Sequence, residues 1–220
     1  EEKKQTKLMK EFLASAKLSF NSKDMTAEIT KYRTDATAVV IPETVIRLCQ
    51  SYRITGIGKG AFKTIFSNYS LQSLQLPDSI TTIGKGAFQY LFKLTSITIP
   101  DGVTTIEDSV FECCESLTEI NLPKKLTSIG NSAFYKCKSL QSLVIPEGVK
   151  EIGRWAFYGC ESLQSLVIPE GVKEIGYAAF EGCSSLTSIS LPASLKDLDS
   201  LDPFKKCDAL KEIIIPKGTR

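Results

Sequence analysis

Apolar residues recur along this chain at an interval of 23 residues. The prolines of the series are separated by 23 residues five times and by 24 residues once: Pro77, Pro100, Pro123, Pro146, Pro169, Pro192 and Pro216. Phenylalanine keeps the same step at Phe88, Phe111, Phe134, Phe157, Phe180 and Phe204. Leucine follows at Leu94, Leu117, Leu140, Leu163, Leu186 and Leu210. A fixed period of this length predicts a solenoid, in which one supersecondary unit stacks on the next.

Each unit has its own internal order. Residues 163–169 are β-prone, alternate between faces and stop at a proline, which predicts a strand. After a turn, residues 172–175 predict a second extended segment, and Gly176 is interpreted as supplying a backbone angle that other residues resist. The spacing of apolar residues in 179–183 is that of one helical turn, with Gly182 at its left-handed end.

Two neighbouring units are nearly identical. Residues 139–153 and 162–176 both read SLQSLVIPEGVKEIG, which indicates duplication of a single unit. A unit of this size cannot bury its apolar faces alone, so the units are predicted to stack strand on strand, at about 4.8 Å per coil.

The repeat L-x-S-L-x-I-P-x-x-V-x-x-I-G-x-x-A-F-x-x-C closely resembles the 23-residue leucine-rich repeat of the bacterial surface-antigen (BspA-like) type, over about residues 26–220. The resemblance implies a curved, right-handed array of about seven coils, with parallel strands on one face and short helical turns on the other. It also implies display on bacterial surfaces and a role in adhesion or protein binding. Secretion or cell-surface localisation is expected on this basis, although no leader is visible in the chain.

The first residues depart from the repeat. Residues 5–18 place Leu8, Met9, Phe12, Leu13 and Ala16 on one stripe, the pattern of an amphipathic helix. Such a helix is expected to cap the first coil, and the alternative is a helix that binds a partner or a membrane surface. We therefore divide the chain into an N-terminal cap, residues 1–25, and a solenoid, residues 26–220. Residues 36–42 resemble a strand, and insertions at 46–53 and 66–69 are expected to form loops.

Composition excludes several functions. The 27 basic and 25 acidic residues are interspersed, so nucleic acid is not an expected partner. Without histidine, no Ser-His-Asp or Cys-His nucleophile and no histidine metal ligand is available. No apolar run is long enough to predict a membrane span. No Ser-x-x-Lys occurs, and the paired Lys150-Glu151 and Lys173-Glu174 are expected to form a solvated face, so we predict no enzymatic activity and no cofactor.

Five of the seven cysteines form another column of the repeat: Cys114, Cys137, Cys160, Cys183 and Cys207. A spacing of 23 residues places them in a line along the stack, whereas a zinc site needs cysteine pairs two to four residues apart. We predict buried thiols and no metal, with Cys113 as the most exposed thiol.

The remaining candidates for function lie on the surface. Alternation along each strand exposes a face of small, mostly uncharged residues, with an apolar centre at the two valines: Ser96, Thr98, Glu119, Asn121, Ser142, Val144, Ser165, Val167, Ser188 and Ser190. A second candidate is an exposed aromatic group, Tyr135, Trp155 and Tyr158.

These surfaces lead to a functional hypothesis. The chain is predicted to be a non-enzymatic, mainly monomeric binding or adhesion protein for protein or host macromolecules at a bacterial cell surface. The alternative is a structural or spacer module with no tight ligand of its own.

Overall fold

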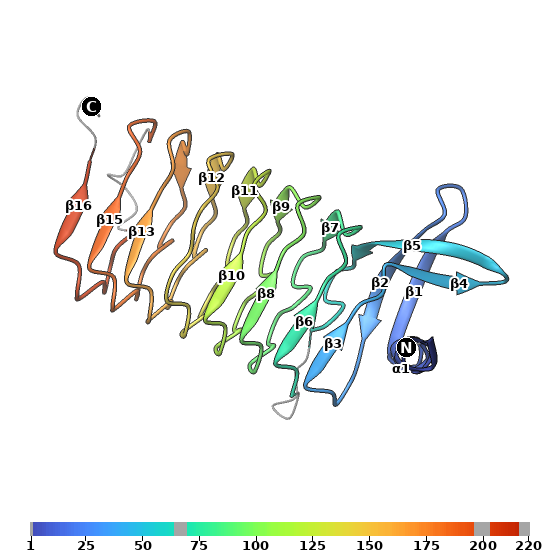
Figure 1. The fold of residues 1–220 in the computed structure, drawn as a ribbon. Helices are drawn as coiled ribbons and strands as arrows, with labels where there is room; N and C mark the ends of the chain where they lie inside the picture. The colour runs from blue at the N-terminus through green and yellow to red at the C-terminus, as the bar shows by residue number, and fades with distance from the viewer. Residues whose placement is uncertain (1, 64–69, 196–202, 216–220) are drawn as a thin grey trace.

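The computed structural model describes residues 2–63, 70–195 and 203–215, and the side chains of these ranges apart from residues 2–6 and 8. It is a solenoid whose coils stack along one axis, with a helix and hairpins at the N-terminal end (Figure 1). The predicted fold class is confirmed. The insertion predicted at 66–69 lies outside the described residues.

One face of the solenoid carries a strand from nearly every coil. Two parallel sheets form it, one ordered β10-β8-β6-β3 and the other β13-β15-β16. Their strands are β3 (Ala38–Val40), β6 (Ser73–Gln75), β8 (Ser96–Thr98), β10 (Glu119–Asn121), β13 (Ser165–Val167), β15 (Ser188–Ser190) and β16 (Glu212–Ile214). Residues 142–144 lie between β10 and β13 in the chain and form no strand. We call this surface the strand face.

A second parallel ladder follows each strand after a turn. It comprises β7 (Thr82–Ile83), β9 (Thr105–Ile106), β11 (Ser128–Ile129), β12 (Glu151–Ile152) and β14 (Glu174–Ile175). In-register pairing aligns Ile129 with Ile106 and with Ile152, so the isoleucines form one buried column. The extended segment predicted at 172–175 is confirmed.

The glycine that follows this ladder allows neighbouring coils to approach closely. The N–H of Gly153 donates to the carbonyl of Ile129 at 2.8 Å, and a Cβ atom on Gly153 would lie 2.6 Å from the backbone nitrogen of Asn131. Gly130 and Gly176 repeat the arrangement, and none of the three has a left-handed φ. The interpretation of Gly176 as a residue needed for its backbone angle is therefore wrong, because the close approach is what requires glycine.

One coil lacks this glycine and interrupts the ladder. Glu107 occupies the position, and among the described residues β9 pairs with β11 while β7 pairs only with β5. A side chain at this position keeps the two coils apart, because the neighbouring glycines leave no room for a Cβ atom. The amine of Lys85 and the carboxylate of Asp108, 2.6 Å apart, bridge the same pair of coils.

The third side of each coil consists of successive turns, so the predicted short helical turns are wrong. Along this side, successive backbone N–H groups donate alternately to a carbonyl of their own coil and to a carbonyl of the next coil. The N–H of Tyr158 donates to the carbonyl of Trp155, whereas the N–H of Phe157 donates to the carbonyl of Ala179 in the following coil at 2.8 Å. Trp155 and Gly159 have left-handed φ values of 54° and 68°, which no helix accommodates. Turns and helices share the same apolar spacing, which explains the error; Gly182 is left-handed as expected, with φ 77°.

The core is a continuous ladder of aromatic rings. Phe134 and Phe157 stack with centroids 5.2 Å apart and planes 5° apart, and both are fully buried. The ladder extends beyond the predicted column to Phe62 and Tyr32, whose rings stack at 4.8 Å. Phe204 is only partly buried and closes the series at 5.8 Å from Phe180.

The N-terminal helix covers the first coil. α1 (Glu2–Ser15) places the buried ring of Phe12 5.7 Å from that of Tyr32, so it adds one more ring to the ladder. The helix ends earlier than predicted because Ala16–Asn21 forms β1, which pairs antiparallel with β2 (Thr26–Tyr32). Leu13 is exposed, contrary to its place on the predicted apolar stripe.

The insertion at 46–53 is a β-hairpin and not a loop. β4 (Thr44–Arg47) pairs antiparallel with β5 (Gln50–Ile57), and the hairpin extends beyond the coil stack (Figure 1). Leu48 and Cys49 form its tip with φ values of 51° and 63°. Two left-handed residues are the geometry of a type I′ turn, which usually contains Asn and Gly.

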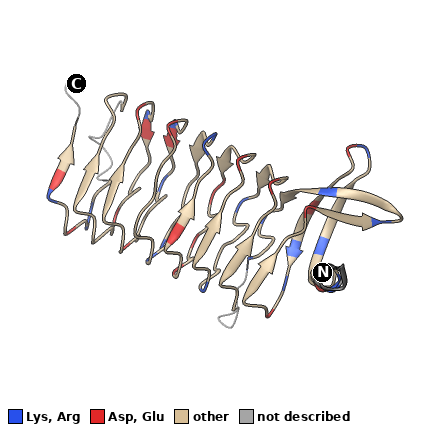
Figure 2. Cartoon of the chain, in the orientation of Figure 1, with Lys and Arg blue, Asp and Glu red and all other residues tan. Residues whose placement is uncertain are grey.

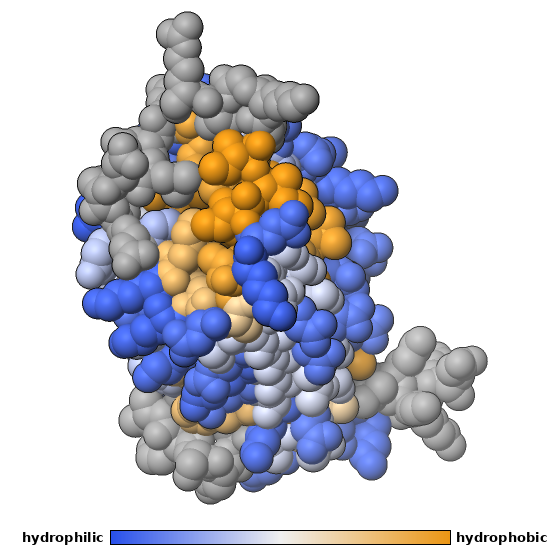
Figure 3. All heavy atoms as spheres, turned by 90° about the vertical axis from the view of Figure 1, so that its left-hand side faces the viewer, coloured by the Kyte–Doolittle hydropathy of each residue, from blue (hydrophilic) through white to orange (hydrophobic). Residues whose placement is uncertain are grey.

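The C-terminal end exposes apolar side chains. Figure 3 views this end and shows a cluster of hydrophobic residues. Ile213, Ile214 and Ile215 are exposed there, and Phe204 and Leu210 are partly buried. The monomeric state of the protein stays a prediction.

Candidate functional site

The structure places all ten predicted residues of the strand face on one side of the solenoid. Ser96 aligns with Glu119, Thr98 with Asn121, Ser165 with Ser188 and Val167 with Ser190, each pair on neighbouring parallel strands. Their side chains point away from the core, although Ser188 and Ser190 are half-buried. Figure 2 shows few charged residues on these strands, with acidic residues on β10 and β16.

The N-terminal half of the strand face is hollowed into a groove of about 590 Å³ across β3, β6, β8 and β10. Four predicted residues line it: Ser96, Thr98, Glu119 and Asn121. Val40 and Gln75 complete the groove on the N-terminal side.

The two valines lie beyond this groove. Val144 is 84% exposed and Val167 is 68% exposed. Val144 belongs to the segment that forms no strand, between the two sheets of the strand face. The strand face therefore has a polar groove at one end and an apolar centre beside it.

The predicted aromatic group divides into two separate pairs. Tyr135 stacks on Tyr158 of the next coil, with centroids 4.9 Å apart. Trp155 instead meets Tyr177 edge to face at 5.8 Å, a residue that the sequence prediction missed. Trp155 and Tyr177 are 22 residues apart and the repeat has a period of 23 residues, so the two residues belong to different columns. A search along one column of the repeat therefore does not pair them.

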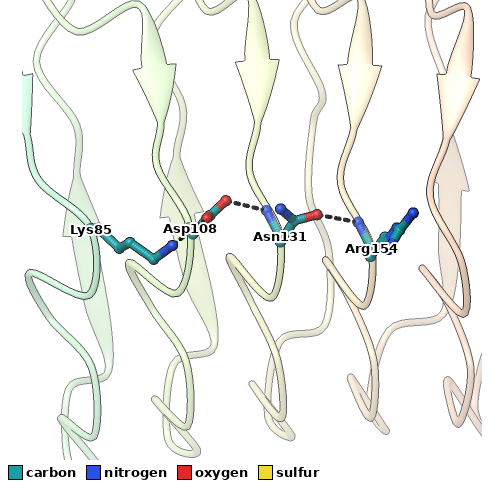
Figure 4. Close-up of polar contacts among 4 residues, drawn as sticks. All are labelled: Lys85, Asp108, Asn131 and Arg154. Atoms are coloured by element: carbon teal, nitrogen blue, oxygen red, sulfur yellow. Dashed lines mark hydrogen bonds and ion pairs between the residues drawn. The ribbon is translucent and has the colours of Figure 1, made fainter.

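A depression of about 590 Å³ lies beside Tyr177, over the ladder β11, β12 and β14. We call it the second-ladder depression. The residues that directly follow Glu107 and the ladder glycines line it in a row, namely Asp108, Asn131, Arg154 and Tyr177. Side chains join this row from coil to coil (Figure 4): the N–H of Asn131 donates to Asp108 Oδ1 at 2.8 Å, and the N–H of Arg154 donates to Asn131 Oδ1 at 2.9 Å.

Asp108 is held as an anion at the end of this row. Partial burial raises the pKa of its carboxyl group, but the hydrogen bonds from Lys85 and from the Asn131 N–H outweigh burial and lower the pKa below its usual value. The carboxylate therefore stays an acceptor that fixes the register of two coils.

The cysteine column is buried as predicted. Each thiol donates to a phenylalanine carbonyl of the preceding coil, for example Cys160 Sγ to Phe134 O at 3.3 Å and Cys183 Sγ to Phe157 O at 3.2 Å. Burial raises the pKa of the Cys160 thiol well above its ordinary value. These thiols stabilise the stack by satisfying backbone carbonyls in the core.

The prediction that Cys113 is the most exposed thiol is wrong. Cys113 is half-buried, and burial together with Glu112 and Glu115 raises the pKa of its thiol. Cys49 is exposed, because it lies at the tip of the β4–β5 hairpin, which the sequence prediction took for a loop.

Titration of the native protein with a thiol reagent is expected to show Cys49 reacting first and Cys113 more slowly. The five buried thiols should react only after denaturation, because burial blocks access and suppresses the thiolate. Cys49→Ser should remove the fast phase alone. Fast reaction of four or more thiols in the native protein would contradict the buried column.

Within the described ranges, no group of three or more Cys, Asp and Glu side chains lies close enough to hold a metal ion. The described part of the chain also contains no helix with the length and apolar character needed to cross a membrane.

Comparison with known proteins agrees with this architecture. A leucine-rich repeat protein from Bacteroides ovatus is 33% identical with a TM-score of 0.82, and the match covers 92% of this chain and 52% of that protein. The Treponema pallidum leucine-rich repeat protein is 28% identical with a TM-score of 0.64, covering 91% and 79%. This chain thus spans about half the length of the Bacteroides protein. Among curated proteins, no sequence matches it.

The family described as "BspA type Leucine rich repeat region" matches in six copies, over residues 55–154 and 127–220. These matches contain the columns of phenylalanine, glycine and cysteine that build the core. The chain belongs to the BspA-type leucine-rich repeat family.

Proposed function

We propose that this chain is a binding or adhesion protein that presents its strand face to a protein or another macromolecule at a bacterial cell surface. The main support for this proposal is the strand face, a series of parallel strands with small exposed side chains and a groove of about 590 Å³. The family, one of non-enzymatic repeat proteins, supports a binding role.

A rigid core supports this proposal. The stacked phenylalanines and the hydrogen bonds between coils hold the strands in fixed register, so the face needs little ordering when it binds. Exposed Val144 and Val167 supply apolar area beside the polar groove, a combination typical of protein interfaces.

A charge placed on the apolar centre tests this proposal. The labelled protein should bind cultured host cells or at least one member of a panel of purified extracellular-matrix proteins. The double variant Val144→Glu and Val167→Glu should weaken that binding tenfold or more, because two carboxylates would be desolvated at the interface. The matched control is Ile46→Glu, an exposed aliphatic residue on the hairpin, which should leave binding unchanged.

Equal binding by the double variant would remove the apolar centre from the interface. No binding by the unaltered protein to any cell or matrix protein would favour the alternative, a structural or spacer solenoid.

A further inference from the structure

The two nearly identical coils differ where they meet the second-ladder depression. After the shared 15-residue segment, one coil continues RWAFYGC and the other YAAFEGC. The three differences fall at Arg154, Trp155 and Tyr158 in the first coil. Arg154 and its counterpart Tyr177 line the depression, and Trp155 contacts Tyr177. Duplication therefore left the strand face of these coils unchanged and altered this side.

Trp155 adopts a backbone conformation that its side chain does not favour. Its φ is 54°, and the corresponding position is Gly60, Gly86, Ser109, Ser132 or Ala178 in other coils. A bulky residue in the left-handed region is unusual, because its Cβ atom crowds the backbone there. Trp155 is also 38% exposed and Tyr177 is 47% exposed, so the edge-to-face pair offers ring surface to a ligand.

The side chains around this pair supply both hydrogen-bond donors and acceptors. Arg154 and Lys173 donate, and Glu151 and Glu174 accept. No ion pair in the described part of the chain involves Arg154, Lys173, Glu151 or Glu174, so these groups remain available. Their charges balance, which favours a neutral ligand.

We propose that the second-ladder depression, with Trp155 and Tyr177 at its edge, binds a neutral oligosaccharide. Sugar hydroxyls both donate and accept, which matches the mixed polar lining, and the C–H face of a pyranose ring packs on an aromatic ring. The depression is lined by residues of four successive coils, roughly 14 Å between the first and the fourth, which suits a chain of sugars better than a single one. A protein partner is less suited, because the large exposed aliphatic residues of the described ranges all lie outside this depression.

The proposal is independent of the strand face and can be tested separately. Trp155 is the only tryptophan in the chain, so its fluorescence reports on this site alone. Titration with cellohexaose, xylohexaose, maltohexaose and chitohexaose is expected to give a saturable change in intensity or emission wavelength with at least one of them. Tyr177→Ala should weaken that binding tenfold or more, and it keeps Trp155 as the fluorescent reporter. Arg154→Gln alters only an exposed side chain and should also weaken the binding.

The strand-face double variant, Val144→Glu and Val167→Glu, is the matched control and should bind the sugar with unchanged affinity. Thermal melting verifies that each variant is folded. Absence of a saturable change with all four oligosaccharides would overturn the proposal. Equal binding by folded Tyr177→Ala and Arg154→Gln variants would also overturn it, and so would a response only to an added protein or peptide.

Discussion

Phe157→Ala is expected to lower the free energy of unfolding by about 3–5 kcal/mol, the usual loss for a fully buried phenylalanine. Its ring stacks on Phe134 at 5.2 Å and on Phe180 at 5.4 Å, so truncation leaves a cavity that faces two coils. Because each coil is stabilised mainly by its neighbours, the weakening should affect the array on both sides. Denaturant unfolding, followed by circular dichroism, measures the change.

Phe204→Ala is the matched control, since it removes the same side chain from the same column at a partly buried position. Its loss should be clearly smaller than that of Phe157→Ala. A loss below about 1 kcal/mol for Phe157→Ala would mean that the ring is not part of a packed core.

Gly176→Ala is expected to destabilise the protein by about 3 kcal/mol, at the upper end of the range for overpacking. The added methyl group would clash with the backbone of Gly153 and Arg154, and neither coil can move away without losing the hydrogen bond from Gly176 N–H to Ile152 O. Thermal and denaturant unfolding of the variant measure this loss.

Gly58→Ala provides the comparison within the same column. A Cβ atom there would lie 3.1 Å from its nearest neighbours, one of which is the mobile end of the Glu28 side chain. Its cost should therefore be the smaller of the two. Equal costs at both positions would show that close approach between coils does not explain these glycines.

The columns of the sequence predicted the core because each column has one environment. Phenylalanine, leucine and cysteine at a 23-residue step are buried in the structure, apart from the partly buried Phe204 and Leu210. The strands lie where alternation ends at a proline, except at residues 142–144, which form no strand. The period also placed the ten strand-face residues on one side, because an outward position in one coil stays outward in the next.

The errors arose where several structures share one local pattern. Apolar residues three apart suit a helical turn and successive β-turns equally, and the left-handed residues Trp155 and Gly159 decide between them. The repeat gave no information on the insertion at 46–53, so the hairpin and its exposed Cys49 were missed.

The pairing of Trp155 with Tyr177 was missed for a different reason. It joins different columns of neighbouring coils, and only the three-dimensional register brings the rings together. A signal was present in the sequence, since the duplicated coils diverge at these positions. A comparison of the two duplicated coils for the residues at which they differ, as well as for those they share, would have identified Tyr177.

Amide hydrogen exchange tests most directly whether the coils form one continuous stack that presents both faces rigidly. The N–H groups of Phe111, Phe134 and Phe157 each donate to the next coil at 2.7–2.8 Å and lie beside the buried ring ladder. These amides are expected to exchange most slowly and at similar rates, because they are exposed only by unfolding of the array. Fast exchange at these three amides, or rates that differ widely between them, would contradict a continuous stack.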